Sequence, residues 1–255
     1  MYERESDSDS LKAIDPPRTM TAVAHVLPQS VAAPKQARSE RTLYRILDAA
    51  EALIAERGLA GMSIPEVARR AGSSVGGFYA RLRDKNELLR ALEERFFQEV
   101  SDRLEALADE RRWRDASVEE IVAAAVDELV TVTEARRELI RAFLFRATQD
   151  SKIRDHAIEF RRLVSARMGG LLLARGPVAS HPEPAVAVDL SVQAAFALMQ
   201  QHVLFDGTYA AGRALSGAEV RREITRFVLS YVGIERGRAS QPDNPGVSQH
   251  PKSSA

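Results

Sequence analysis

The sequence contains no cysteine. This absence excludes a disulfide framework, a thiolate zinc site and a cysteine nucleophile. The sequence also lacks a basic N-terminal segment followed by an apolar core, and no apolar run approaches the roughly 18 residues of a membrane span. We therefore expect a soluble, cytoplasmic protein.

Net charge gives no indication of a partner, because 36 lysines and arginines balance 36 aspartates and glutamates. Signatures of enzyme chemistry are also missing. There is no P-loop, no G-x-G-x-x-G and no H-E-x-x-H. No histidine has the glutamate three residues before it that a di-iron bundle requires; the histidines are His25, His156, His181, His202 and His250. We expect no enzymatic activity, no cofactor and no metal site.

The chain does contain 45% apolar residues, enough for a packed core in 255 residues. Residues 1–36 and 237–255 mix serine, proline and polar residues without a sustained period, which is typical of disordered tails. Between them, apolar residues recur every three or four positions. The sequence thus predicts an all-α fold, with a small N-terminal domain over 37–90 and a larger helical domain over 91–236.

A pair of short helices is predicted from residue 63 onward. Ser63 and Glu66 have the spacing of a capping box, which favours a helix over 64–71. Gly72 then supplies the backbone freedom for a turn. The first helix of this domain is expected over 39–57, because its apolar stripe ends at a glycine suited to a C-terminal cap.

The second short helix is expected over 75–82, capped by Ser74. Asp84 and Glu87 have the spacing of another capping box, opening a long helix whose apolar stripe extends to Leu107. Two further boxes, Ser117 with Glu120 and Ser216 with Glu219, begin later helices. Further helices are predicted over 117–133, 137–147, 152–175, 184–206 and 216–235, and no strand is predicted.

Basic residues gather on the predicted helix-turn-helix. Five basic residues stand against one acidic residue, Asp84, between positions 69 and 85; they are Arg69, Arg70, Arg81, Arg83 and Lys85. This local excess suits a polyanionic partner, although an ordinary solvated face has the same composition.

The stretches ILDAAEALIAERG and MSIPEVARRAGSSVGGFYARLRDKNELL resemble the N-terminal DNA-binding domain of the tetracycline-repressor-like (TetR) family of one-component bacterial regulators. The resemblance covers residues 41–96, with landmarks at Ala49, Ala50, Gly58, Ser63, Ala68, Gly72, Ser74, Gly76, Tyr79, Lys85 and Leu88. It implies a helix-turn-helix DNA-binding domain over 37–90 and a helical effector-binding and dimerisation domain over 91–236. It implies no particular ligand.

The resemblance also implies roles for individual residues. Ser63 and Pro65 would lie near phosphates, and Tyr79 and Lys85 would each contact one. The entry of the recognition helix would comprise Ser73, Ser74, Val75, Gly76 and Gly77. The plain alternatives are that Ser63 is only a cap, Tyr79 a half-buried aromatic residue and Lys85 a solvated lysine.

The sequence departs from the family pattern at Val75, Gly77 and Leu82. Two adjacent glycines, Gly76 and Gly77, cost a helix roughly 1 kcal/mol each relative to alanine. They suggest a close approach to DNA, or a helix that orders fully on binding. We expect sparse base reading by Ser73, Ser74, Arg81 and Val75, the last against a thymine methyl group.

In the C-terminal domain the family places a ligand among the middle helices. The candidate effector-pocket residues are Val126, Leu129, Phe143, Phe160, Met168, Phe196, Met199 and His202. Their apolar character predicts a hydrophobic or aromatic effector, although such residues at helical spacing are more often plain core. We expect a homodimer through helices 184–206 and 216–235, a palindromic operator, and repression released by the effector, with activation as the alternative.

Two other functions are compatible with parts of the sequence. Residues Gly72-Ser73-Ser74-Val75-Gly76 match the G-x-S-x-G nucleophile elbow of serine hydrolases. That motif requires a strand before the turn, whereas the residues before Gly72 have a helical pattern. The second alternative is a non-enzymatic helical dimer or adaptor, from which binding to DNA would distinguish this chain.

Overall fold

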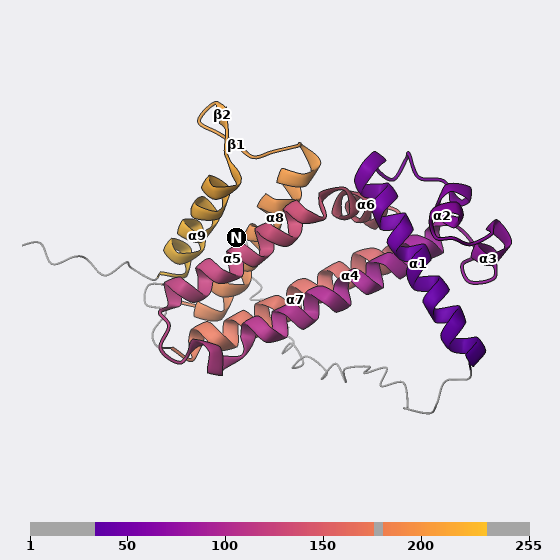
Figure 1. Ribbon diagram of the computed structural model, residues 1–255. Coiled ribbons are helices and arrows are strands. Elements are labelled where there is room, and N and C mark those ends of the chain that lie inside the picture. Colours follow the sequence, from indigo (N-terminus) through magenta and orange to yellow (C-terminus); the bar gives the residue numbers. More distant parts are fainter. Residues whose placement is uncertain (1–33, 176–180, 234–255) are drawn as a thin grey trace, which may run out of the picture. The chain divides into compact units, whose positions relative to one another are not determined.

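The computed structural model describes residues 34–175 and 181–233 (Figure 1). The described residues belong to two units, one that ends at Thr42 and one that begins at Leu43. In the first unit the described residues are the start of helix α1, where the Thr42 hydroxyl donates to the Arg38 carbonyl over 2.9 Å. The predicted tails lie outside the described residues, apart from residues 34–36, which belong to α1.

The described residues are almost wholly helical, so the predicted all-α fold is confirmed. The helices are α1 (Pro34–Arg57), α2 (Ile64–Arg70), α3 (Val75–Tyr79), α4 (Lys85–Ala108), α5 (Val118–Ala135), α6 (Arg137–Ala147), α7 (Ser151–Leu173), α8 (Pro184–Leu204) and α9 (Gly217–Val232), with a 3₁₀ turn η1 (Glu110–Trp113). Helix α1 begins before the predicted start at Ser39. Helix α3 ends before the predicted Leu82, although Leu82 is buried as expected.

Two of the four predicted capping boxes are confirmed. Ser117 and Glu120 close one at the start of α5, and Ser216 and Glu219 close the other at the start of α9. In each box the serine hydroxyl accepts a backbone N–H and the glutamate accepts the N-cap N–H. These helices therefore begin where their own sequences satisfy the first N–H groups.

The other two predicted boxes are wrong. Ser63 makes no side-chain cap bond, and the Glu66 carboxylate pairs with Arg57 on α1 over 2.7 Å. Asp84 does cap α4, but Glu87 accepts from the backbone N–H of Arg83 over 2.6 Å instead of closing the box. In both cases a nearby arginine provides an alternative donor for the glutamate.

Two apolar cores lie in the unit that begins at Leu43. The first core is formed by side chains of α1, α2, α3, α4 and α6. Its largest fully buried side chains include Phe78, Leu53 and Leu88. The second joins α4, α5, α7, α8 and α9. Helix α4 contributes side chains to both cores, Leu92 to the first and Leu104 to the second. It is therefore the continuous element between the helix-turn-helix and the larger helical domain (Figure 1).

A short antiparallel hairpin between α8 and α9 was not predicted. Strands β1 (Tyr209–Ala210) and β2 (Arg213–Ala214) pair across a two-residue turn (Figure 1). Both turn residues, Ala211 and Gly212, have positive φ values of 49° and 76°, as a type I′ turn requires. Ala-Gly is a weak turn signal in sequence because alanine rarely adopts this conformation.

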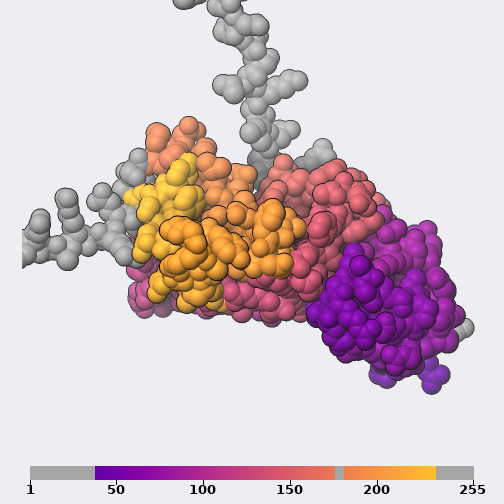
Figure 2. Space-filling view, turned by 90° about the horizontal axis from the view of Figure 1, so that it is seen from above, coloured from indigo at the N-terminus to yellow at the C-terminus, as the bar shows by residue number. Residues whose placement is uncertain are grey.

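Helix α8 buries one side and leaves another side apolar and exposed. The exposed side chains are Val186, Leu190, Leu198 and Leu204. On α9, Phe227 is similarly exposed. Figure 2 shows α9 in yellow beside the orange segment that precedes it, both facing the viewer. Within one chain, α8 therefore leaves part of its apolar surface exposed.

Candidate nucleic-acid interface and ligand cavity

Gly72 forms the turn of the helix-turn-helix. Its φ is +61°, a left-handed conformation that only glycine adopts without strain, and it follows the α2 cap residue Ala71. Helix α2 leads into this turn. The G-x-S-x-G stretch therefore lies on a helix, a turn and a helix, and lacks the strand that a nucleophile elbow needs.

The start of α3 is fixed by Ser74, as predicted. Its hydroxyl accepts from the backbone N–H of Gly77 over 2.9 Å. Val75 and Tyr79, one turn apart on α3, are 40% and 53% exposed, whereas Phe78 between them is fully buried. Phe78 thus anchors the helix to the core while Val75, Gly76 and Tyr79 form its outer surface.

The two glycines of α3 have different surroundings. A Cβ added at Gly77 would lie 2.5 Å from the Ser73 hydroxyl and 3.2 Å from the Ser74 hydroxyl. At Gly76 the nearest atom would be 3.9 Å away. Gly77 therefore has a packing reason within the protein, whereas Gly76 leaves open space on the outer surface.

Ser63 and Pro65 lie at the start of α2. Both are exposed, and Ser63 has the extended backbone of an N-cap residue, with φ −121° and ψ 148°. The Ser63 hydroxyl oxygen accepts no capping hydrogen bond from a backbone N–H of α2.

Lys85 is the first residue of α4, as expected, but its ammonium has partners within the protein. Nζ donates to the carbonyl oxygens of Leu59 and Met62 over 2.7 and 2.9 Å. Burial lowers the pKa of Lys85. An ammonium has three N–H donors, so one donor is left beyond these two bonds.

The basic excess of this region is partly neutralised by acidic residues from outside the motif. Arg70 pairs with Glu56 on α1 over 2.6 Å, and Arg83 pairs with Glu87 over 3.1 Å. Arg81 is half-buried, and its guanidinium donates to the Gly77 carbonyl over 2.8 Å. Charge counted along the sequence therefore overstates the positive charge available to a partner.

Sequence reasoning missed Arg45. This exposed residue of α1 brings its Nη1 within 3.7 Å of the position that a Cβ would take at Gly72. It adds a basic side chain beside the turn. Its place on the polar side of the α1 stripe was readable from the sequence, but its proximity to Gly72 depends on the packing of α1 against α2.

A cavity of about 230 Å³ lies among α4 to α9. Seven of the eight predicted pocket residues line it, namely Val126, Leu129, Phe143, Phe160, Met168, Phe196 and Met199. His202 does not. The cavity lining is mostly apolar. It includes Phe97 and Phe160, whose rings are tilted against each other with their centroids 5.3 Å apart.

Two buried polar side chains of the lining were missed. Glu93 on α4 is 1% exposed, and its Oε1 accepts no hydrogen bond from the described residues. Ser191 on α8 is equally buried, with an unpartnered hydroxyl. Glu93 was detectable, because it stands four residues after Leu89 and three before Phe96 within the apolar stripe of α4.

Burial dominates the electrostatics of Glu93. It raises the pKa of this carboxyl to about 7, against the opposing influence of His156 and Arg90, while Asp150 raises it further. Oε2 lies 3.6 Å from His156 Nδ1 on α7. The nearby Arg90 forms an ion pair with Asp150, with 2.7 Å between Nη2 and Oδ2.

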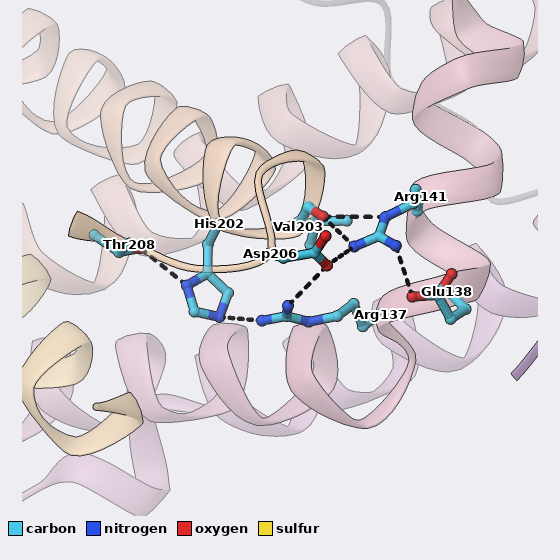
Figure 3. Close-up of polar contacts among 7 residues, drawn as sticks. All are labelled: Arg137, Glu138, Arg141, His202, Val203, Asp206 and Thr208. Atoms are coloured by element: carbon cyan, nitrogen blue, oxygen red, sulfur yellow. Dashed lines mark hydrogen bonds and ion pairs between the residues drawn. The ribbon is translucent and has the colours of Figure 1, made fainter. Parts of the chain in front are cut away.

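His202 belongs to a polar network between α6 and the end of α8 (Figure 3). Arg137 Nη2 lies 2.5 Å from His202 Nε2, and His202 Nδ1 lies 2.9 Å from the Thr208 hydroxyl. A guanidinium can only donate, so Nε2 accepts and Nδ1 carries the proton. Burial, followed by the charge of Arg137, lowers the pKa of His202.

Arg141 extends the same network. It donates to the Val203 carbonyl over 2.6 Å and to the Glu138 carboxylate over 2.9 Å, and it also pairs with Asp206 (Figure 3). Glu138 in turn lies close to α1, with Oε2 3.8 Å from the position of a Cβ at Gly58. Polar contacts thus join α6 to the end of α8, and Glu138 lies near the end of α1.

Within residues 34–175 and 181–233, no group of three or more His, Asp or Glu side chains is arranged to hold a metal ion. Over the same residues, no helix combines the length and apolar character needed to cross a bilayer.

Comparisons with known proteins agree with this geometry. Residues 46–92 match the family described as bacterial regulatory proteins, tetR family. The uncharacterized HTH-type transcriptional regulator YvdT of Bacillus subtilis is 30% identical over 98 residues, which are 38% of this chain and 47% of that protein. The chain thus matches about half the length of this curated relative.

Solved structures match over a longer stretch. A protein from Mesorhizobium loti assigned to the TetR family has a TM-score of 0.60 at 22% identity, covering 77% of this chain and 98% of its own. The regulator FadR from Bacillus subtilis, in complex with stearoyl-CoA, has a TM-score of 0.55 at 20% identity, covering 75% and 99%. At these identities the likeness concerns the fold.

A short exposed helix that follows a glycine turn and a preceding helix is the arrangement of a helix-turn-helix DNA-binding domain. Residues 46–92 therefore form a helix-turn-helix domain similar to that of the tetR family of bacterial regulatory proteins.

Proposed function

We propose that this regulator binds a palindromic operator as a homodimer and represses transcription until a small apolar molecule enters the cavity. The observation that carries the proposal is the continuity of α4. This helix begins with Lys85 beside the helix-turn-helix and lines the cavity from Glu93 onward. A ligand in the cavity therefore contacts the element that continues into the DNA-binding domain.

In this proposal, DNA meets the exposed surface of α3 and the start of α2. Tyr79, Lys85, Ser63 and Pro65 contact phosphates, and Arg45 adds a further basic side chain. Residues at the start of α3 and the side chain of Arg81 contact base edges. The residues at the start of α3 are Ser73, Ser74, Val75, Gly76 and Gly77. The exposure of Val75 and Tyr79 and the anchoring of Phe78 support this assignment.

The proposed dimer forms through α8 and α9. Val186, Leu190 and Phe227 expose apolar surface that a second copy would cover. A two-fold axis through this interface would place the two α3 helices in successive major grooves, roughly 34–36 Å apart. Sedimentation of the full chain at micromolar concentration tests it, with Leu190→Glu as the disrupting variant and Leu173→Glu, an exposed leucine of α7, as control. A wild-type monomer would contradict the dimer.

The proposed effector acts by favouring one arrangement of α4 and α6 over another. Side chains of α6 pack into the core of the helix-turn-helix, and its arginines hold the end of α8. Coupling of this kind typically changes affinity by about 1–3 kcal/mol. The FadR complex with stearoyl-CoA supports an apolar effector, because that protein shares the fold.

A mobility-shift assay on the region upstream of its own gene tests the whole scheme. We expect a discrete complex that a stabilising ligand, found by a thermal-shift screen, dissociates. A transcription reporter carrying the same region distinguishes repression from activation. A folded dimer that shifts no duplex would instead support the adaptor function.

A further inference from the structure

The cavity has a polar end and an apolar end. Along α4 its lining extends from Glu93 to Leu107, about 21 Å apart on a straight helix. At Glu93 the cavity lies near the start of α7, because Glu93 Oε2 is 3.6 Å from His156 Nδ1. The rest of the lining is mostly aliphatic and aromatic and includes Leu107, Leu172 and Val232. An elongated apolar molecule with one polar end matches this distribution.

Glu93 determines which polar group a ligand can place at this end of the cavity. Its carboxylate is taken out of water, yet Oε1 accepts no hydrogen bond from any described residue. The neighbouring basic side chains do not supply one. His156 Nδ1 stays 3.6 Å from the other oxygen, and Arg90 is bound by Asp150. A buried acceptor without a donor is costly, so a ligand that brings a donor gains affinity.

The other charged residues of the lining depend less on a ligand for hydrogen bonds, because they have an ion-pair partner or contact with water. Glu128 forms an ion pair with Arg103 over 3.1 Å, and both are partly exposed. Arg161 is half-buried, so water can solvate its guanidinium. Neither loses as much as Glu93 when the cavity holds an apolar molecule.

We propose that the cavity selects an elongated apolar molecule with a protonated amine at one end, and that the amine donates to Oε1 of Glu93. Glu93 is the specificity-determining residue, and the aliphatic chain lies along α4 toward Leu107. An anionic head would meet the buried carboxylate of Glu93 and is disfavoured. This inference rests on the proposed function, in which the cavity holds the effector.

The test compares three molecules with the same tail on the full chain: decylamine, decanol and decanoate, each below its micellar concentration. Calorimetric titration at pH 7.5 should give the order amine, alcohol, carboxylate, with the amine tighter than the alcohol by at least about tenfold. Glu93→Gln should bring the amine to the level of the alcohol. Glu128→Gln, on the same cavity, should leave the order unchanged.

Thermal unfolding of each variant shows whether it is folded, and Glu93→Leu provides a second substitution without charge. The inference is overturned if decylamine does not bind, if the three molecules bind alike, or if the amine preference survives in Glu93→Gln.

Failure of this inference is distinguishable from failure of the proposed function by a mobility shift with the same molecules. If decanoate binds and releases the operator while decylamine does neither, the ligand class is wrong and the regulator scheme stands. If decylamine binds through Glu93 but leaves operator binding unchanged, the ligand class stands and effector release is wrong.

Discussion

The ammonium of Lys85 lies 2.7 Å from the carbonyl oxygen of Leu59, so the first residue of α4 holds the loop between α1 and α2. The same ammonium also reaches the Met62 carbonyl. Lys85, for which the sequence predicts a phosphate contact or plain solvation, therefore has a structural role. Its third donor remains compatible with a phosphate oxygen.

Lys85→Ala should separate these two roles. Removing the ammonium leaves two loop carbonyls without their donor, so we expect the free energy of unfolding to fall by about 1 kcal/mol in urea denaturation. If Lys85 also contacts a phosphate, the salt slope of operator binding should decrease by about 1. Lys152→Ala, an exposed lysine of α7, is the control. Lost stability with an unchanged affinity and slope would mean that Lys85 is purely structural.

The glycine pair of α3 gives a matched comparison. Gly76→Ala should stabilise the protein by up to about 1 kcal/mol, because alanine is the better helix former and the site is open. Gly77→Ala should gain less, because its Cβ displaces the Ser73 hydroxyl and crowds the Ser74 cap. Urea denaturation measures both. Adding Ser73→Ala to Gly77→Ala should recover part of the difference, and equal gains at both positions would contradict the packing explanation.

His202 should make stability depend on pH. Its pKa is lowered in the folded protein by burial and by Arg137, so the unfolded chain binds the proton more tightly. The contribution of His202 is present above the unfolded pKa of about 6.5 and is lost as pH falls below it. Between pH 7.5 and pH 5, the unfolding free energy of the wild type should therefore fall more than that of the His202→Gln variant. A difference that is constant with pH would contradict this assignment.

Glu93 should show the opposite trend. Its pKa is raised to about 7 by burial, so the folded protein binds the proton more tightly than the unfolded chain does. Its stability contribution is greatest in acid and falls as pH rises from about 4.5 to about 7, by on the order of 1–3 kcal/mol. Comparing wild type with Glu93→Gln across this range measures it. A wild type that gains relative stability over the same rise in pH would show that Glu93 is ionised and paired when folded.

Most helix starts and the turn at Gly72 were predictable from short sequence motifs. Ser74 caps α3, Gly72 makes the turn, and two serine–glutamate boxes begin α5 and α9, because each depends on residues a few positions apart. The hairpin at Ala211–Gly212 was missed because its turn residues are weak signals.

Other errors arise because a side chain binds a partner outside the short motif from which its role was predicted. Glu66 pairs with Arg57 instead of closing a cap, and Lys85 binds carbonyls more than twenty positions away. The apolar cavity lining follows from helical stripes, so most of it was predictable. The partners of His202 and Glu93 depend on how α4, α6, α7 and α8 pack, which periodicity does not specify.

The central claim is that α3 presents its exposed surface to duplex DNA. The most direct measurement is fluorescence anisotropy of a labelled duplex from the upstream region, titrated with wild type, Tyr79→Ala and Ser74→Ala, with unrelated duplexes alongside. The account predicts saturable wild-type binding, a similar loss on every duplex for Tyr79→Ala, and an altered preference among duplexes for Ser74→Ala. Folded variants that bind every duplex as the wild type does would contradict it.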